Sequence, residues 1–250
     1  MYQRERENEI LKIVKKEGYV TVKYLVERLH YSNASINRDL NSMESQKLIR
    51  RTYGGVELIK THGHGALPFR YHKEHVAKRK MAHAAAELVN DGDFIFIDNT
   101  TTTQFIVEFL AEKKDVTVIS NNMAVVTQAS ELGLRAICLG GAIMEAPCML
   151  LSAETVENAM LYKANKAFFS SGFVSEDGDI GGGGLYTLLH RTMVKNSDES
   201  YFLADAKKFE KEYETKTFSM SVASVTGMIT NRVLGKDWKE KFPGVRFIEV

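Results

Sequence analysis

Four consecutive threonines, Thr100 to Thr103, form an unusual polar run in this sequence. They follow the apolar segment "FIFID" and precede "QFIVEFL", whose spacing predicts a helix. Hydroxyl groups and backbone N–H groups at the start of a helix can bind an oxyanion. The same residues can also simply cap the helix. The run is therefore a candidate ligand site, with a helix cap as the alternative.

Strand and helix patterns alternate around this run, from Asp93 to the end of the chain. Apolar segments such as "DFIFID", "DVTVIS" and "SYFLAD" alternate with helical ones such as "MAVVTQASEL" and "LYTLLHRTMVKN". This alternation predicts an α/β fold with a mostly parallel sheet covered by helices. Ligands in such folds bind at the carboxyl ends of the strands. Here those ends carry small, polar or charged residues: Asp98-Asn99-Thr100, Ser120-Asn121-Asn122, Gly140-Gly141, Ser171-Gly172 and Asp205 to Lys208.

The first sixty residues show a different pattern, that of short helices followed by a hairpin. Apolar residues recur at helical spacing around Ile10 and Val14, and Thr21 and Ser32 are placed to cap two further helices. Two short alternating runs flank Gly54-Gly55, which is a hairpin signal. Three short helices and a hairpin predict a winged helix-turn-helix.

The domain organisation follows from this change of pattern. We expect a DNA-binding domain over 1–60, a linker over 61–70 and an α/β domain over 71–250. The linker segment "KTHGHGALPFR" has no periodicity and contains glycine and proline. Its two histidines, His62 and His64, could bind a metal ion but are interpreted as linker residues.

The start of the predicted third helix, "SNASINRD", is the part that meets base edges in a helix-turn-helix. Asparagine can pair with adenine, and arginine with guanine or phosphate. A solvated polar helix face is the alternative. Two arginines in the wing favour DNA binding, as does the excess of Lys and Arg over Asp and Glu in the first sixty residues. The predicted DNA-binding residues are Ser32, Asn33, Ser35, Asn37, Arg38, Arg50, Arg51 and Tyr53.

Composition excludes several other classes of protein. The formal net charge of the 250 residues is +1, so any nucleic-acid surface must be local. Cys138 and Cys148 form no CxxC pair and are too few for a disulfide framework or a zinc cluster. The charged start lacks the apolar run of a signal peptide, and no apolar run reaches the roughly 20 residues of a membrane helix. We expect a cytoplasmic protein with no membrane segment, cofactor or metal.

The segment from Val20 to Leu58 resembles the amino-terminal signature of the DeoR family of bacterial transcriptional regulators. Arg38-Asp39-Leu40 matches the end of its helix-turn-helix motif, and Arg51-Thr52-Tyr53-Gly54-Gly55 matches the downstream motif. The chain departs from the family at Asn37, where a second arginine is frequent. This resemblance implies double-stranded operator DNA as a partner.

The rest of the chain is similar to the family's carboxy-terminal domain, whose fold resembles that of ribose-5-phosphate isomerases and CoA-transferases. The resemblance implies that the threonines cradle a phosphate, that Lys208 supplies charge, and that Asp98, Asn121 and Asp205 bond sugar hydroxyls. Thr100 stands where the family usually has glycine. The implied effector-binding residues are Asp98, Thr100, Thr101, Thr102, Thr103, Asn121, Gly140, Gly141, Gly172, Gly183, Asp205 and Lys208.

The two-domain pattern predicts a DNA-binding regulator, and the resemblance implies a repressor of carbohydrate-metabolism genes that is relieved by a phosphorylated sugar. Family resemblance and operator symmetry imply a homo-oligomer, either a dimer or a tetramer. One alternative is a sugar-phosphate isomerase with a DNA-binding appendage, for which Asp98 and Asp205 are candidate bases. Another is a regulator whose pocket has lost its ligand, and Thr100 is its best support.

Overall fold

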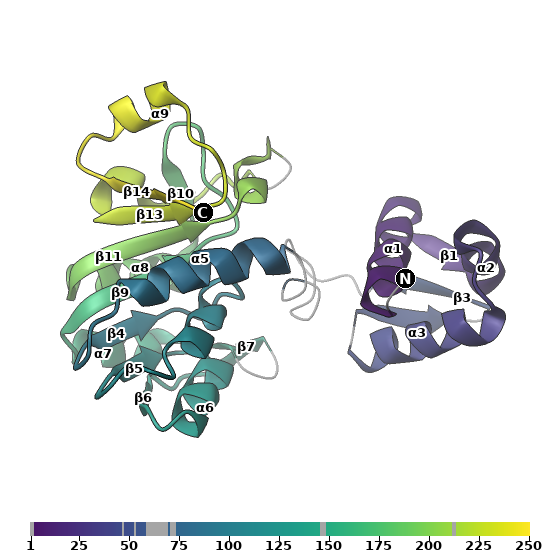
Figure 1. The fold of residues 1–250 in the computed structure, drawn as a ribbon, viewed down its shortest axis with the longest axis horizontal. Helices are drawn as coiled ribbons and strands as arrows, with labels where there is room; N and C mark the ends of the chain where they lie inside the picture. The colour runs from purple at the N-terminus through teal and green to yellow at the C-terminus, as the bar shows by residue number, and fades with distance from the viewer. Residues whose placement is uncertain are drawn as a thin grey trace. The chain divides into compact units, whose positions relative to one another are not determined.

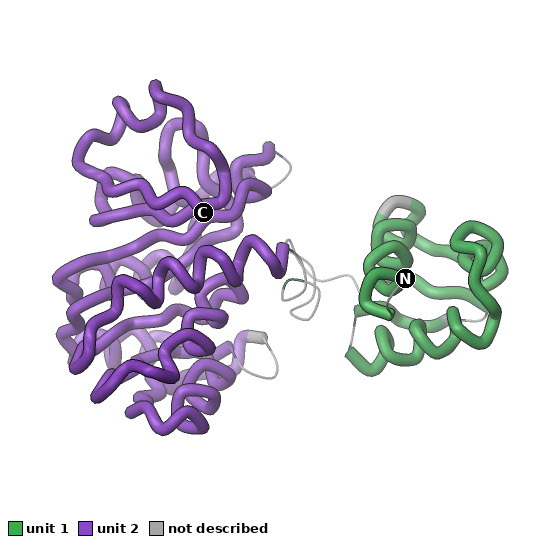
Figure 2. Tube along the Cα trace, viewed as in Figure 1, with its two compact units in different colours: residues 1–73 green, residues 74–250 purple. Residues whose placement is uncertain are grey.

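The computed structural model describes residues 3–46, 48–52, 54–58, 70, 74–145, 149–211 and 214–250. The chain divides into two compact units, Met1–Lys73 (unit 1) and Glu74–Val250 (unit 2), coloured separately in Figure 2. Each unit has its own hydrophobic core.

Unit 1 is a three-helix fold with a small antiparallel sheet. Its elements are α1 (Gln3–Glu17), β1 (Tyr19–Thr21), α2 (Val22–Leu29), α3 (Asn33–Ser45), β2 (Ile49–Thr52) and β3 (Gly55–Leu58). Thr21 caps α2 by accepting from the backbone N–H of Tyr24 at 3.1 Å, and Ser32 caps α3 by accepting from that of Ser35 at 3.2 Å. The predicted winged helix-turn-helix is confirmed. The sheet order is β1-β3-β2, and β1 was not predicted because three residues are too few to show periodicity.

Unit 2 is built on a seven-stranded sheet in which every neighbouring pair is parallel, in the order β14-β13-β11-β9-β4-β5-β6 (Figure 1). Its strands are β4 (Phe94–Ile97), β5 (Thr117–Ser120), β6 (Arg135–Cys138), β9 (Ala164–Ser170), β11 (Ser197–Ala204), β13 (Gly227–Thr230) and β14 (Arg246–Glu249). The predicted parallel α/β architecture is therefore confirmed.

Helices cover both faces of this sheet, with α5 in front of it and α7 and α8 behind it in Figure 1. The helices of unit 2 are α5 (His75–Glu87), η1 (Thr103–Phe109), α6 (Met123–Glu131), α7 (Ala153–Met160), α8 (Gly184–Lys195), η2 (Ala206–Phe209), η4 (Val222–Ser224) and α9 (Lys236–Lys241). Two small antiparallel pairs complete the unit: β7 (Ile143–Glu145) with β8 (Met149–Leu150), and β10 (Asp179–Gly181) with β12 (Phe218–Ser221).

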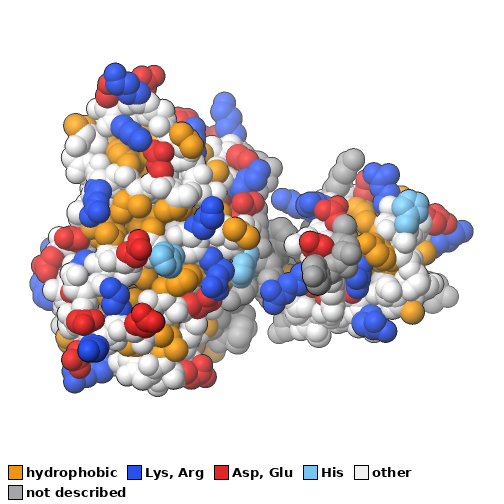
Figure 3. Space-filling view, viewed as in Figure 1, with side chains coloured by type: hydrophobic (Ala, Val, Ile, Leu, Met, Phe, Trp, Pro, Cys, Tyr) orange, Lys and Arg blue, Asp and Glu red, His pale blue; other side chains and the backbone are white. Residues whose placement is uncertain are grey.

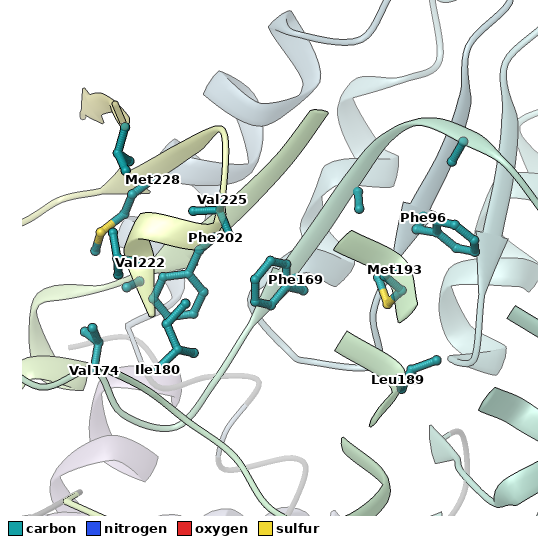
Figure 4. Packing of buried hydrophobic residues seen from close by; sticks show 14 of the residues in the cluster. Phe96, Phe169, Val174, Ile180, Leu189, Met193, Phe202, Val222, Val225 and Met228 are labelled. Atoms are coloured by element: carbon teal, nitrogen blue, oxygen red, sulfur yellow. The ribbon is translucent and has the colours of Figure 1, made fainter. Parts of the chain in front are cut away.

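The core behind the sheet forms where aromatic side chains from neighbouring strands meet α8. Phe169 of β9 lies opposite Phe202 of β11, and their ring centroids are 5.5 Å apart. Leu189 and Met193 of α8 belong to the same cluster, and Figure 4 shows them near Phe169. On the other face, Phe168 and Tyr201 stack with ring centroids 5.6 Å apart. Burial of both faces explains why these strands read as nearly continuous apolar runs.

The segment "QFIVEFL" differs from its expected form, because it folds as the 3₁₀-helix η1 and not as an α-helix. β-branched and aromatic residues such as Ile106, Val107 and Phe105 lose rotamer freedom in an α-helix. In addition, the hydroxyl of Thr103 bonds the carbonyl oxygen of Thr100 at 3.2 Å and so competes with the backbone for the first turn.

The surface matches the small net charge. On the face of unit 2 seen in Figure 3, acidic and basic side chains are interspersed among hydrophobic ones. Within the described ranges, no helix combines the length and apolar character that crossing a membrane requires.

Candidate functional site

The candidate site lies where the strand order of unit 2 reverses. From β4 the chain adds β5 and β6 on one side, and then β9, β11, β13 and β14 on the other. Open α/β sheets bind ligands in the crevice outside the strand ends at such a reversal. The residues that leave the sheet there are Asp98 after β4 and Ser170 at the end of β9, with Lys208 following β11.

The Asp98 carboxylate is completely buried and organises the loop that follows β4. Its Oδ1 accepts from the backbone N–H of Thr100 at 3.1 Å and from the hydroxyls of Thr100 and Thr103 at 2.8 and 2.5 Å. Its Oδ2 accepts from the backbone N–H of Ser170 at 3.0 Å and from His190 Nε2 at 3.1 Å. Five protein donors thus surround the carboxylate, and Asp98 holds the loop in shape. Its contact with sugar hydroxyls stays a prediction.

The charge of Asp98 is stabilised by these donors. Burial acts to raise the pKa of Asp98, but the interaction with His190 and the bonds from Thr103 and Ser170 outweigh it. The net result is a pKa below the ordinary value for this carboxyl. The loop is therefore built around an ionised carboxylate.

Lys208 joins the threonine loop to the neighbouring strand end. Its Nζ donates to the hydroxyl of Thr102 at 2.9 Å and to the hydroxyl of Ser170, and it lies 3.7 Å from Asp205 Oδ2. The Lys208 side chain is 11% exposed, so its ammonium is largely removed from water. Thr102 and Lys208 are 106 positions apart in the chain, and the structure brings these two predicted site residues together as expected.

A second lysine contacts the same loop from α5. Lys78 Nζ donates to the hydroxyl of Thr101 at 3.0 Å, and both residues are buried. Two ammonium groups therefore lie against consecutive threonines. These ammonium groups are cationic donors of the kind that bind oxyanions, and they lie beside the carboxylates of Asp98 and Asp205.

Thr100 fits its position without the glycine that is usual there. Its φ is negative, since the non-glycine residues with positive φ in the described chain are His30, Glu74 and Asp115. Its hydroxyl bonds both Asp98 Oδ1 and the hydroxyl of Thr103, at 2.8 and 3.0 Å. Thr100 therefore contributes to the loop's own hydrogen bonding.

The other strand-end residues predicted for the effector site surround this cluster. The Asn121 side chain donates to the carbonyl oxygen of Leu150 at 2.6 Å, and its Oδ1 has no partner among the described residues. Asp205 is buried and caps η2 by accepting from the backbone N–H of Lys207 at 3.1 Å. Gly172 follows β9 by two residues, and Gly183 immediately precedes α8.

Gly140 and Gly141 have positive φ values of 68° and 114°. A Cβ at Gly141 would overlap the hydroxyl of Thr155 in α7, and that hydroxyl donates to the carbonyl oxygen of Gly140 at 2.8 Å. Gly141 is therefore required for close packing against α7, and the positive φ of Gly140 favours glycine there although a Cβ would meet no neighbour. Within the described ranges, no group of three or more His, Cys, Asp or Glu side chains could hold a metal ion.

In unit 1, the first turn of α3 presents the predicted base-reading surface. Ile36 and Leu40 are fully buried, and Ser32, Asn33 and Arg38 are exposed. Ser32 and Ser35 hydroxyls are within 2.9 Å of each other. Arg38 is exposed and forms no hydrogen bond or ion pair with the described residues, which leaves its guanidinium open to solvent.

The wing arginines are already engaged within the protein. Arg51 donates to Asn37 Oδ1 at 2.6 Å and to Asn41 Oδ1, so it braces the wing against α3. Asn37 also donates to the carbonyl oxygen of Asn33 at 2.9 Å, which occupies both ends of its amide. Arg50, 71% exposed, pairs with Glu57 at 2.5 Å. Tyr53 lies outside the described residues.

A buried ion pair anchors α3. Asp39 is fully buried and accepts from Arg6 of α1 through both oxygens, at 2.8 and 3.0 Å. The hydrogen bond to Asp39 is the main cause that raises the pKa of Arg6. This pair fixes the helix whose other face carries Arg38.

We expect Arg6→Ala to lower the free energy of unfolding of unit 1 by about 2 kcal/mol, because Asp39 would stay buried without its cation. The loss is smaller than for a wholly enclosed pair because the Arg6 side chain is 16% exposed. Urea unfolding followed by far-ultraviolet circular dichroism measures it. The matched control Arg50→Ala removes an exposed pair and should change stability by less than about 1 kcal/mol. Equal losses in the two variants would contradict a structural role for the Arg6–Asp39 pair.

Comparison with known protein families decides the identity of both units. Residues 73–232 match the DeoR C terminal sensor domain, and residues 6–62 match the DeoR-like helix-turn-helix domain. This chain belongs to the DeoR family of transcriptional regulators. The resemblance inferred from the sequence motifs is thereby confirmed.

Other DeoR-family regulators resemble this chain along most of their length. The HTH-type transcriptional repressor GlcR of Bacillus subtilis (strain 168) is 30% identical over 211 residues, which cover 83% of this chain and 81% of GlcR. The glycerol-3-phosphate regulon repressor of Escherichia coli (strain K12) is 25% identical over 224 residues, 89% of each chain. Among solved structures, ribose 5-phosphate isomerase A of Methanocaldococcus jannaschii matches with 23% identity, 56% coverage of each chain and a TM-score of 0.40.

The structure of this DeoR-family chain also reveals site residues that the sequence did not single out. Lys78 could have been found from the helical periodicity of α5. The buried face of that helix contains Ala77, Met81, Ala82 and Ala85, and the same spacing places Lys78 on this face. Ser170 had no such signal, since its contact with Lys208 depends on the sheet order. His190 lies on the helix that follows the glycines, and the sequence left open whether it faces the ligand or solvent; the structure places it against Asp98.

Proposed function

We propose that this chain represses genes of carbohydrate metabolism by binding operator DNA through unit 1, and that a phosphorylated sugar bound by unit 2 relieves the repression. The observation that carries the second part is the position of the Lys208 ammonium, which bonds Thr102 and Ser170 where the strand order reverses. Relief of repression requires that the ligand binds the DNA-free form more tightly than the DNA-bound form.

The chemistry of the cluster suits a phosphate. Lys208 and Lys78 supply positive charge, and Thr101 and Thr102 supply hydroxyls beside them. Charge-assisted hydrogen bonds of this kind are about twice as strong as neutral ones. The seven-residue 3₁₀-helix η1 is too short and too irregular to contribute much dipole, so the lysines take the role first expected of the helix start.

The names of the relatives support the same function. One is a repressor of a glycerol-3-phosphate regulon, and another, in Streptococcus mutans, is a lactose phosphotransferase system repressor that is 28% identical over 238 residues. One name links repression to a phosphorylated polyol, and the other links it to a phosphotransferase system for a sugar. We extend that association to this chain.

A thermal-shift screen of the purified full-length chain tests the effector. The panel contains aldose, ketose and polyol phosphates, each beside its unphosphorylated parent and inorganic phosphate. A ligand at a hundred times its dissociation constant should stabilise unit 2 by about 2.7 kcal/mol. A complete absence of shifts would favour the alternative of a regulator without a ligand.

The rival proposal of an isomerase requires a base within reach of a substrate proton. Asp98 has both oxygens bonded by protein donors, and Asp205 caps η2 and faces Lys208. These engagements argue against either carboxylate as a free base. Turnover of ribose 5-phosphate by the purified chain, followed by ketose formation, distinguishes an enzyme from a regulator.

We also propose that the chain acts as a homo-oligomer, because a two-fold operator matches a two-fold protein. Light scattering coupled to size exclusion distinguishes a dimer from a tetramer. A monomer that binds its operator with full affinity would contradict this part of the proposal.

We expect Arg38→Ala to weaken binding to an operator selected from a random duplex library by about 1–3 kcal/mol, because its exposed guanidinium is placed to contact a base. Affinity for unselected DNA should change much less. Gel-shift titration at fixed salt measures both. Lys12→Ala, on the exposed face of α1, serves as the control. An equal loss of affinity for all DNA sequences would show that Arg38 contacts the phosphate backbone and not a base.

A further inference from the structure

Three asparagines at adjacent strand ends carry buried polar atoms without a partner. Asn99 Nδ2 follows β4, and Asn121 Oδ1 and Asn122 Nδ2 follow β5; none has a hydrogen bond within the described part of the chain. The three residues are at most 1% exposed. Because Ile97 lies opposite Ser120 in the parallel register, these segments leave the sheet side by side. Buried amide groups without partners are costly and rare, so three at one sheet edge point to a ligand.

Two of these side chains are held in place by their other end. Asn121 Nδ2 donates to the carbonyl oxygen of Leu150 at 2.6 Å, and Asn122 Oδ1 caps α6 by accepting from the backbone N–H of Ala124 at 2.9 Å. Each is thus fixed by the fold while one polar atom is left unpaired. Asn99 differs, because no described residue forms a hydrogen bond with its side chain.

We propose that Asn99, Asn121 and Asn122 bind the hydroxyl-bearing part of the ligand, while the Lys208–Thr102 pair binds its phosphate. The inference rests on the proposed function and specifies how the site distinguishes a sugar phosphate from other phosphates. Two amide donors and one carbonyl acceptor match neighbouring hydroxyls, since each hydroxyl both donates and accepts. Asn99 joins the two subsites, because it immediately precedes the threonine run.

A ligand role and a structural role for Asn99 predict opposite effects on stability. Replacing a buried amide that has no partner removes a cost and not a bond, so Asn99→Ala should leave the melting temperature of the ligand-free protein unchanged or raise it. Asn122→Ala loses the α6 cap and should lower the melting temperature. An Asn99 variant that melts earlier than wild type, as the Asn122 variant should, would overturn the proposal.

Calorimetry of the full-length protein with two probes completes the test. The first probe is whichever sugar phosphate gives the largest thermal shift with wild type, and the second is inorganic phosphate. We expect Asn99→Ala to raise the Kd for the sugar phosphate about tenfold and the Kd for inorganic phosphate less than twofold. Lys208→Gln should weaken the binding of both probes.

The outcomes separate this inference from the function on which it rests. If wild type binds the sugar phosphate and Asn99→Ala binds it equally well, the hydroxyl-reading role is wrong and the proposed function stands. Equal losses for both probes would place Asn99 in the phosphate subsite and also overturn the inference. If wild type binds no sugar phosphate, the proposed function and this inference fall together.

Discussion

Asp98→Ala is expected to destabilise unit 2 by about 4 kcal/mol, because it leaves several buried donors without an acceptor. The carboxylate accepts from Thr100, Thr103, Ser170 and His190, and it is completely buried. The measurement is urea unfolding followed by tryptophan fluorescence. Trp238 is the only tryptophan of the chain and is packed in the core of unit 2, so it reports that unit alone.

Acid unfolding gives the same prediction a second readout. The pKa of Asp98 in the folded protein lies below the ordinary value of about 3.9. The ionised carboxylate therefore contributes its full stabilisation to the folded state at any pH above about 3.9. This stabilisation is lost as the pH falls through the folded pKa. The stability difference between wild type and Asp98→Asn should therefore be constant near neutral pH and narrow below about pH 4.

The control for both readouts is Asp237→Ala, which removes an exposed carboxylate from α9 and should leave the fluorescence midpoint unchanged. If Asp98→Ala lowers the free energy of unfolding no more than the control does, the loop holds its shape without the carboxylate. A stability difference that stays constant down to acidic pH would show that Asp98 is not ionised in the folded protein.

The sequence predicted the elements well where a short-range pattern determines them. Caps at Thr21 and Ser32 and the glycines of the wing turn depend on neighbours within a few residues, and the structure has these features. The parallel sheet was predictable because both of its faces are buried. η1 was misassigned, since the bonds of Thr103 with Asp98 and Thr100 override the apolar spacing.

The candidate site was only partly predictable for a physical reason. Strand ends could be read from the sequence, so Asp98, Thr102 and Lys208 were named. The order of the strands could not be read, and it is this order that places Ser170 and His190 beside Asp98. Whether a polar group faces a ligand or a protein donor depends on those neighbours.

Lys208→Gln is expected to abolish the release of operator DNA by the sugar phosphate while operator affinity in its absence is unchanged. Glutamine can still donate to Thr102 or Ser170, so the variant removes mainly the charge. Loss of the charge next to a phosphate, in a position only 11% exposed, should raise the effector Kd roughly a hundredfold. Calorimetry and gel shifts with and without effector measure the two quantities.

Thr102→Val tests the partner of this lysine with little change in shape. It removes a single hydroxyl and should raise the effector Kd about tenfold. Lys208 Nζ and the Thr102 hydroxyl are hydrogen-bonded at 2.9 Å. The double variant should therefore lose less effector-binding free energy than the sum of the losses in the two single variants. Strict additivity would mean that the two side chains do not act on one phosphate.

The neighbouring Lys207 supplies the matched control for the charge. Its side chain is 47% exposed and pairs with Glu210 at 2.7 Å, so Lys207→Gln removes the same charge one residue away. We expect that variant to bind effector and to release operator as wild type does, because solvent screens a charge at that position. Trp238 fluorescence must show unit 2 folded in both variants. If the two lysine variants respond alike, the threonine run is a loop held by Asp98 and not a phosphate site.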